Sequence, residues 1–187
     1  MFGLGGFKKD RDEAMSSLLK AANQGHAYAQ YQLGLAYGGD RDEENAAKFH
    51  RAAAEQGLAE AQFMLGGMYA EGVGLPKNEA TAVEWWRKAA EQNHMQAQNN
   101  LGQFYVFGGV GVPQDREEAV RWLRKAASAG SADATKTLVE MNVPPSGWLY
   151  KCSNCGRVEK YREKVKDSVC SQCIGVPADM QYLGPTY

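Results

Sequence analysis

The chain repeats itself, and this repetition restricts the folds that it can adopt. A Leu-Gly pair followed three residues later by a tyrosine occurs three times, beginning at Leu33, Leu65 and Leu101. A pair of adjacent alanines recurs in step, at spacings of 32, 36 and 37 residues. These alanine pairs begin at Ala21, Ala53, Ala89 and Ala126. Repeats of this length are typical of helical solenoids, whose units bury their apolar faces only by stacking on one another.

One unit, residues 57–92, has the pattern of a helical hairpin. Ala61, Leu65 and Tyr69 lie four residues apart, so they form one stripe on a helix. Residues 72–76 interrupt that helix, and Asn78 is suited to cap the start of a second one. The apolar face of the second helix alternates small and large residues, namely Ala82, Trp85, Trp86, Ala89 and Ala90. We therefore predict two antiparallel helices per unit, with the tryptophans packed between helices.

The first and last units are incomplete. Residues 10–22 match residues 115–127, so the array begins with a second helix whose first helix is absent. It closes with a lone first helix at residues 131–142, before Pro144 and Pro145. The predicted organisation is a flexible arm at 1–9, a solenoid at 10–142, a linker at 143–147 and a small domain at 148–187.

Polar residues mark the start of each second helix. Asp10, Asp42, Asn78 and Asp115 stand at the same offset before an alanine, as N-cap residues do. Glu13 and Glu118 follow the first and last of these by three residues, which is the pattern of a capping box. The connection inside the first hairpin is shorter than in the later two, so we expect it to turn more tightly.

Composition limits the classes of function. The 187 residues are 44% apolar, enough for an ordinary core, and carry a formal net charge of −1. That charge gives no general attraction to nucleic acid or to anionic membranes. The sequence contains no apolar run long enough to span a bilayer, and its start lacks the order of a secretory signal. We expect a cytoplasmic protein with no membrane partner.

The cysteines predict a metal site near the C-terminus. They form two CxxC motifs, Cys152 with Cys155 and Cys170 with Cys173. Two such turns can direct four thiolates at one ion, which suits tetrahedral Zn²⁺ in a structural role. Residues 156–169 can supply two short strands, so we expect a small β-rich zinc ribbon. Iron in a rubredoxin-like site and a disulfide or thiol relay are the alternatives.

Basic residues near this site raise a second possibility. Lys151, Arg157, Lys160, Arg162, Lys164 and Lys166 surround the cysteine motifs. Glu159, Glu163 and Asp167 interrupt the run, so a solvated strand face of alternating charge explains it better than nucleic-acid binding.

The repeat unit resembles the Sel-one-like repeat, a relative of the tetratricopeptide repeat. The resemblance covers roughly residues 10–142 and rests on Gly57, Ala61, Leu65-Gly66, Tyr69, Gly72-Val73-Gly74, Ala82, Trp85 and Lys88-Ala89-Ala90. It implies a mainly α protein, a right-handed α/α superhelical solenoid that serves as an adaptor for protein partners, without catalytic residues. This sequence departs from the pattern at Asn93, where the repeat has glycine, and it lacks the cysteines that some relatives carry within each repeat.

A partner groove can be placed on the first helices. By the same resemblance, the face not used for packing is concave. Its candidate residues are Tyr28, Tyr31, Leu35, Phe63, Asn99, Gln103 and Lys136. An extended peptide would anchor an apolar side chain on Tyr31 and Phe63, while Asn99 and Gln103 would bond its backbone. A merely solvated inner surface is the alternative.

The histidines do not indicate catalysis. His26 and His94 stand two hairpins apart, too far to share an ion, and His50 lies on a second helix where nothing pairs with it as a nucleophile. We expect solvated or capping roles for all three. The sequence thus predicts a non-enzymatic adaptor for a protein or peptide partner. A nucleic-acid-binding zinc-ribbon module and a thiol or zinc redox sensor are the alternatives.

Overall fold

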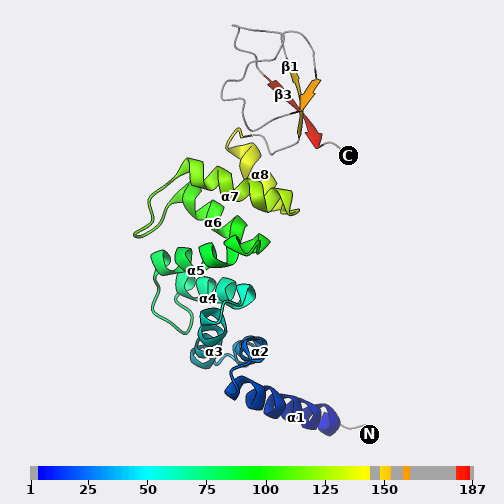
Figure 1. Ribbon diagram of the computed structural model, residues 1–187, viewed down its shortest axis with the longest axis vertical. Helices are drawn as coiled ribbons and strands as arrows, with labels where there is room; N and C mark the ends of the chain where they lie inside the picture. Colours follow the sequence, from blue (N-terminus) through cyan, green and yellow to red (C-terminus); the bar gives the residue numbers. More distant parts are fainter. Residues whose placement is uncertain (1–3, 144–147, 153–157, 161–179, 186–187) are drawn as a thin grey trace.

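The computed structural model describes the backbone of residues 4–143, 148–152, 158–160 and 180–185, and the side chains of residues 13–143. Within these residues the chain forms eight α-helices followed by three β-strands (Figure 1). The helices are α1 (Leu4–Asn23), α2 (Ala27–Gly39), α3 (Glu43–Glu55), α4 (Ala59–Glu71), α5 (Glu79–Glu91), α6 (Met95–Phe107), α7 (Arg116–Ser128) and α8 (Ala132–Glu140).

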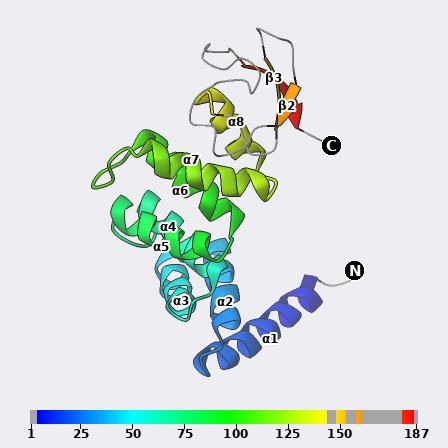
Figure 2. The ribbon, with the colours of Figure 1, turned by 45° about the horizontal axis from the view of Figure 1, so that its top comes forward.

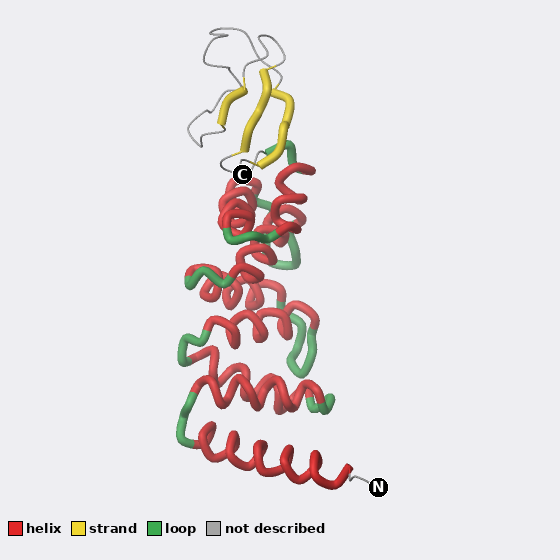
Figure 3. Tube along the Cα trace, turned by 90° about the vertical axis from the view of Figure 1, so that its right-hand side faces the viewer, coloured by secondary structure: helices red, strands yellow, loops and turns green. Residues whose placement is uncertain are grey.

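The helices form three hairpins flanked by two single helices. Each of the pairs α2–α3, α4–α5 and α6–α7 is antiparallel and stacks on the next, so the helices follow one another as layers (Figure 3). Helix α1 and the β-strands lie at opposite ends of this stack (Figures 1 and 2). The predicted mainly α array of stacked helical hairpins, with an unpaired helix at each end, is therefore confirmed.

The N-terminal boundary differs from the prediction. Helix α1 begins at Leu4, within the segment 1–9 that we expected to be a flexible arm. Asp10 consequently lies inside the helix and is not an N-cap. No proline interrupts residues 4–10, and extending an existing helix adds one hydrogen bond per residue without a new nucleation step. The glycines of this segment weaken the helix without ending it.

Three of the predicted N-caps are confirmed. The side chains of Asp42, Asn78 and Asp115 accept hydrogen bonds from the backbone N–H three residues later, at 3.2, 3.0 and 3.0 Å. The predicted capping box at Asp115 is only half formed. The Glu118 carboxylate accepts hydrogen bonds from Arg121 and from the Trp122 indole, each at 2.9 Å, so it does not return to the cap.

The three hairpin connections differ in length but end in the same hydrogen bond. In each hairpin the N-cap N–H donates to the carbonyl of the repeat tyrosine. These bonds run from Asp42 to Tyr37 (2.9 Å), from Asn78 to Tyr69 (2.8 Å) and from Asp115 to Tyr105 (2.9 Å). The first connection, between Gly39 and Glu43, is the shortest of the three, as the sequence predicted. The loops therefore vary in length without changing where the second helix starts.

The core lies between the hairpins and is built on the repeated positions. Leu33, Leu65 and Leu101 are fully buried, and so are both alanines of the second and third pairs. Trp86 and Trp122 are buried between helices as predicted, whereas Trp85 is half-buried. Asn93, which replaces the usual glycine, has φ of 66°, a left-handed conformation that asparagine tolerates better than most residues.

Two repeated hydrogen bonds connect successive helices. A glutamine near the start of each first helix donates to the carbonyl of the preceding alanine pair, from Gln30 to Ala22 (3.2 Å), Gln62 to Ala54 (3.2 Å) and Gln98 to Ala90 (3.0 Å). An arginine of a second helix donates to the next repeat tyrosine, Arg51 to Tyr69 at 2.9 Å and Arg87 to Tyr105. The sequence analysis missed both sets, although Ala-Gln recurs before each Leu-Gly pair.

A small antiparallel sheet follows α8. Its strands are β1 (Trp148–Cys152), β2 (Val158–Lys160) and β3 (Met180–Pro185), in the order β2-β1-β3. Cys152 ends β1 and pairs with Met180 in register. Cys155, Cys170 and Cys173 lie outside the described residues. The predicted β-rich C-terminal segment thus has a sheet, and the four-thiolate site stays a prediction.

Candidate partner-binding groove

The predicted groove residues come from four different layers of the stack. Tyr28, Tyr31 and Leu35 lie on α2, Phe63 on α4, Asn99 and Gln103 on α6, and Lys136 on α8. The structure brings Leu35 and Phe63 to one hollow. Tyr28 and Tyr31 lie beside each other with ring centroids 6.1 Å apart. Lys136 is exposed, 3.9 Å from Glu140 on its own helix, and joins neither group.

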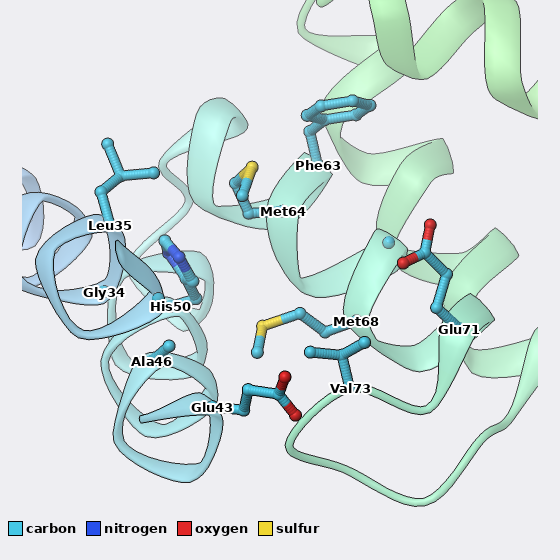
Figure 4. Close-up of a pocket in the computed structure, with 12 residues that line it drawn as sticks. Gly34, Leu35, Glu43, Ala46, His50, Phe63, Met64, Met68, Glu71 and Val73 are labelled. Carbon is cyan, nitrogen blue, oxygen red and sulfur yellow. The ribbon is translucent and has the colours of Figure 1, made fainter. Parts of the chain in front are cut away.

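The hollow has a volume of about 450 Å³ and lies between α2, α3 and α4 (Figure 4). Its wall is mostly apolar, with Met64, Met68 and Val73 in addition to Leu35 and Phe63. The exposed carboxylates Glu43 and Glu71 and the imidazole of His50 supply its polar side-chain groups. A site of this size and character suits an apolar side chain of a partner.

Comparison of the hairpins explains why the hollow lies here. His50, Trp86 and Leu123 follow the equivalent alanines Ala46, Ala82 and Ala119 by four residues, and each lies against the glycine of a Leu-Gly pair. In the next layer the Trp86 indole reaches across to Phe104, with ring centroids 5.2 Å apart. One layer earlier, the equivalent pair is His50 of the first hairpin and Met68 of the second. Because this pair is smaller than an indole facing a phenyl ring, it leaves space between the layers.

His50 is buried, contrary to the solvated role expected from the sequence. The residue is 2% exposed, and its Nδ1 has no hydrogen-bond partner among the described residues. Burial lowers the pKa of His50 to about 4, so the ring is neutral at physiological pH. A buried polar atom without a partner costs about 1–3 kcal/mol. The alignment of His50 with Trp86 and Leu123 was the sequence signal for this burial.

Tyr31 and Tyr28 lie at the N-terminal end of the predicted groove. Tyr28 is 63% exposed, whereas Tyr31 is half-buried, 5.6 Å from the His50 ring between centroids. Burial raises the pKa of Tyr31, and the charges of Glu60 and Tyr28 act in the same direction. Tyr31 is therefore partly exposed to solvent, and its ring packs against the buried imidazole of His50.

Phe63 is also half-buried and joins two layers. Its ring stacks on His94, with centroids 4.7 Å apart and planes 24° apart. The Nδ1 of His94 accepts a hydrogen bond from Ala97 N–H at 3.3 Å, which confirms the capping role expected for this histidine. Burial lowers the pKa of His94. Neither Tyr31 nor Phe63 is fully buried, so both keep surface for a partner.

The middle of the predicted groove carries two amide side chains. Asn99 and Gln103 are half-buried on α6. The Asn99 Oδ1 is shielded from water and has no hydrogen-bond partner among the described residues. A shielded amide oxygen without a partner is costly, so Asn99 is the polar group of this face whose hydrogen bonding is incomplete among the described residues.

The described residues contain no group of three or more His, Cys, Asp or Glu side chains arranged to hold a metal ion. None of the described helices is long and apolar enough to cross a membrane.

Solved structures of repeat proteins resemble this stack of helical hairpins. No curated protein sequence matches this chain significantly. A crystal structure of a Sel1 repeat protein from Oxalobacter formigenes is 36% identical, with a TM-score of 0.62, and the match covers 68% of this chain and 98% of that one. Helicobacter pylori cysteine rich protein B is 26% identical, with a TM-score of 0.58, over 73% of this chain and 100% of that one.

The family model supplies the assignment. The Sel1 repeat model matches four successive segments, residues 1–26, 27–58, 59–94 and 96–131. The segment boundaries fall near the turns between hairpins, and the first segment includes the N-terminal residues that we expected to lie outside the array. With these four segments covering well over half of its length, this chain belongs to the Sel1 repeat family.

Proposed function

We propose that this chain is a non-enzymatic adaptor that binds a protein or peptide partner along the groove of α2, α4 and α6. The observation that carries the proposal is the hollow between α2, α3 and α4, which lies on the predicted groove and is lined by Leu35 and Phe63. Sel1 repeats typically serve as scaffolds for protein interactions, so a partner-binding face is expected of the family. The unpaired Asn99 oxygen extends the same face toward α6.

A peptide-display selection on the full chain tests this groove. We expect selected peptides to bind more weakly to Leu35→Ser and to Gln103→Ala, because both changes remove groove side chains from different layers. Val110→Ser is the matched control for Leu35→Ser, since Val110 is an aliphatic residue 81% exposed in the α6–α7 connection. Binders that lose affinity only for the control, or for none of the three variants, would show that the groove is not the binding face.

We also propose that Zn²⁺ joins Cys152, Cys155, Cys170 and Cys173 in a structural site. The support is the paired CxxC spacing together with the place of the first motif in the sheet. Cys152 ends β1, and β2 begins at Val158, antiparallel to β1, so the first CxxC falls in the connection of a hairpin. Such a turn is where a zinc ribbon holds two of its thiolates. Reduced thiolates fit a cytoplasmic location, which we propose as well.

Metal analysis of the purified chain tests the site. We expect about one zinc ion per chain and its loss in Cys152→Ser, because a structural site needs all four thiolates. A short C-terminal segment cannot build a sufficient core alone, so the metal should supply much of its folding free energy. Chelation should then leave the far-ultraviolet circular dichroism of the helices nearly unchanged. Iron in place of zinc, or disulfides that persist without metal, would contradict the proposal.

A further inference from the structure

We infer that the hollow between α2, α3 and α4 is a subsite for one aromatic side chain, indole or phenol, carried by a basic segment of the partner. This inference rests on the proposed adaptor function and specifies what the groove selects. Three observations support it: the shape of the hollow, the charge at its edge and the unpaired nitrogen in its wall.

The shape of the hollow follows from the chain's own repeats. In the second hairpin the Trp86 indole fills the space between layers, packing against Gly66 and facing Phe104. Between the first and second hairpins, His50 of α3 and Met68 of α4 occupy those positions and leave the hollow open. An aromatic ring of a partner can therefore occupy this hollow, as the Trp86 indole occupies the equivalent space in the next layer.

The walls suit an aromatic ring. Met64 and Met68 enter the hollow from α4, and Phe63 lies at its edge (Figure 4). Thioether sulfurs make favourable contacts with aromatic rings, and methionine side chains adapt to different shapes. Phe63 can pack against the same ring in an offset or edge-on arrangement.

The charge at the edge selects the neighbours of that ring. Glu43 and Glu71 line the hollow and are exposed, and no described residue of the lining is cationic. Glu60 lies farther along the groove, close enough to raise the pKa of Tyr31. Lysine or arginine beside the aromatic residue would meet these carboxylates, whereas acidic neighbours would be repelled.

His50 supplies the polar part of the site. The neutral imidazole has one N–H donor and one acceptor nitrogen, and its Nδ1 is unpaired among the described residues. A phenol O–H or an indole N–H is a small donor on an apolar body, which matches one polar atom in an apolar wall. Full engagement of Nδ1 requires the imidazole to turn toward the ligand.

Methyl NMR of the full chain tests the subsite directly. The methionine methyls are labelled with ¹³C, and three N-acetylated tripeptide amides are titrated: Lys-Trp-Lys, Glu-Trp-Glu and Lys-Ala-Lys. We expect Lys-Trp-Lys to shift the resonances of Met64 and Met68 saturably and to leave those of Met95 and Met141 unchanged. Glu-Trp-Glu should bind about tenfold more weakly because of the adjacent carboxylates. Lys-Ala-Lys should give no saturable shift.

Two variants close the hollow from opposite walls. His50→Trp introduces the residue of the second hairpin, and Met68→Phe introduces the equivalent of Phe104. Each should abolish the response of Met64 to Lys-Trp-Lys while the helical circular dichroism is retained. Having both variants keeps the test decisive if one of them fails to fold.

The results that would overturn the subsite differ from those that would overturn the adaptor function. The subsite is wrong if Lys-Trp-Lys causes no saturable shift, if Lys-Ala-Lys acts equally well, or if both filled variants still respond. If display-selected peptides lose affinity for Gln103→Ala but leave Met64 and Met68 unshifted, the adaptor stands and the subsite fails. If Lys-Trp-Lys titrates the hollow but no selected peptide depends on the groove, the hollow binds aromatic rings and the adaptor function fails.

Discussion

A Cβ atom added at Gly66 would lie 2.5 Å from the indole of Trp86, so α4 and α5 approach each other at a point with no room for a side chain. Gly34 stands in the same relation to His50, and Gly102 to Leu123, each with a contact of 2.6 Å. This explains why a Leu-Gly pair recurs in every complete hairpin. The leucine fills the core, and the glycine admits the second helix.

The first prediction follows from that contact. Gly66→Ala should destabilise the fold by about 1–3 kcal/mol, because the buried indole cannot move aside without disturbing the next layer. Gly67→Ala is the matched control, since a Cβ at Gly67 would meet nothing within 4 Å. It should stabilise α4 by about 0.5–1 kcal/mol through helix propensity. Urea unfolding followed by circular dichroism measures both, and equal effects would contradict the account.

The second prediction concerns a missing glutamine. Gln56 donates to Gln30 Oε1 at 2.7 Å, and Gln92 donates to Gln62 Oε1 at 2.8 Å. The equivalent position in the next repeat is Ala129, and there the Oε1 of Gln98 is buried without a partner among the described residues. A hollow of about 520 Å³ lies between Gln98 and Ala129. Ala129→Gln should therefore stabilise the chain by about 1 kcal/mol.

Ala129→Leu is the control for this change, because it adds apolar bulk but leaves the Gln98 oxygen unpaired. Gln92→Ala should act in the opposite direction, costing about 1–3 kcal/mol by removing the partner of a buried amide. Thermal unfolding of the three variants measures these effects. A gain from leucine as large as that from glutamine would mean that filling space, not the hydrogen bond, stabilises this position.

The third prediction tests the link between hairpins. Tyr69→Phe removes the acceptor of the Arg51 guanidinium, whose hydrogen bond measures 2.9 Å and joins α3 to α4. Because the pair is only partly buried, we expect a loss of about 1 kcal/mol. Tyr37→Phe serves as the comparison, since the Tyr37 ring stacks on Phe49 and its hydroxyl has no partner among the described residues. Its unfolding free energy should be nearly unchanged.

The fourth prediction is a dependence of stability on pH. The pKa of His50 is about 4 in the fold against an ordinary 6.5, so below pH 6.5 the unfolded chain binds a proton that the native state resists. Stability should therefore fall as the pH decreases from 6.5 toward 4, by at most about 1.4 kcal/mol per pH unit from this group. The lowered pKa of His94 acts in the same direction.

His50→Leu isolates this contribution, because it places at position 50 the residue type found at Leu123. The unfolding free energy of the variant should decline less than that of the wild type between about pH 7 and about pH 5. Parallel declines would show that His50 is not protonated preferentially in the unfolded state.

Much of this architecture could be read from the sequence because it depends on local or periodic patterns. The spacing of the Leu-Gly and alanine pairs predicted stacked hairpins, and the offsets of Asp42, Asn78 and Asp115 predicted three caps. A cap depends on a few neighbouring backbone groups, and a stripe depends on helix periodicity alone. The start of α1 was missed, since the glycines at its beginning resemble an unstructured arm.

For the groove, too, the sequence predicted some features and missed others. The sequence placed Leu35 and Phe63 on equivalent faces of two successive first helices, and it placed amide side chains farther along that face at Asn99 and Gln103. It offered no sign of the hollow, the buried imidazole or the unpaired Gln98 oxygen beyond the alignment of the repeats. Each of these arises where a side chain is smaller than the one at the equivalent position of another repeat. His50 is smaller than its equivalent Trp86, and Ala129 is smaller than its equivalent Gln92.

The sequence by itself therefore determined which helices form and in what order they stack. Only the tertiary structure decided where the stack is incompletely filled. The physical reason is that periodicity fixes the direction in which a side chain points, whereas a cavity or an unpaired atom depends on the combined sizes of side chains from adjacent layers. The sizes of His50, Met68 and Leu35 matter only once α2, α3 and α4 have placed them together.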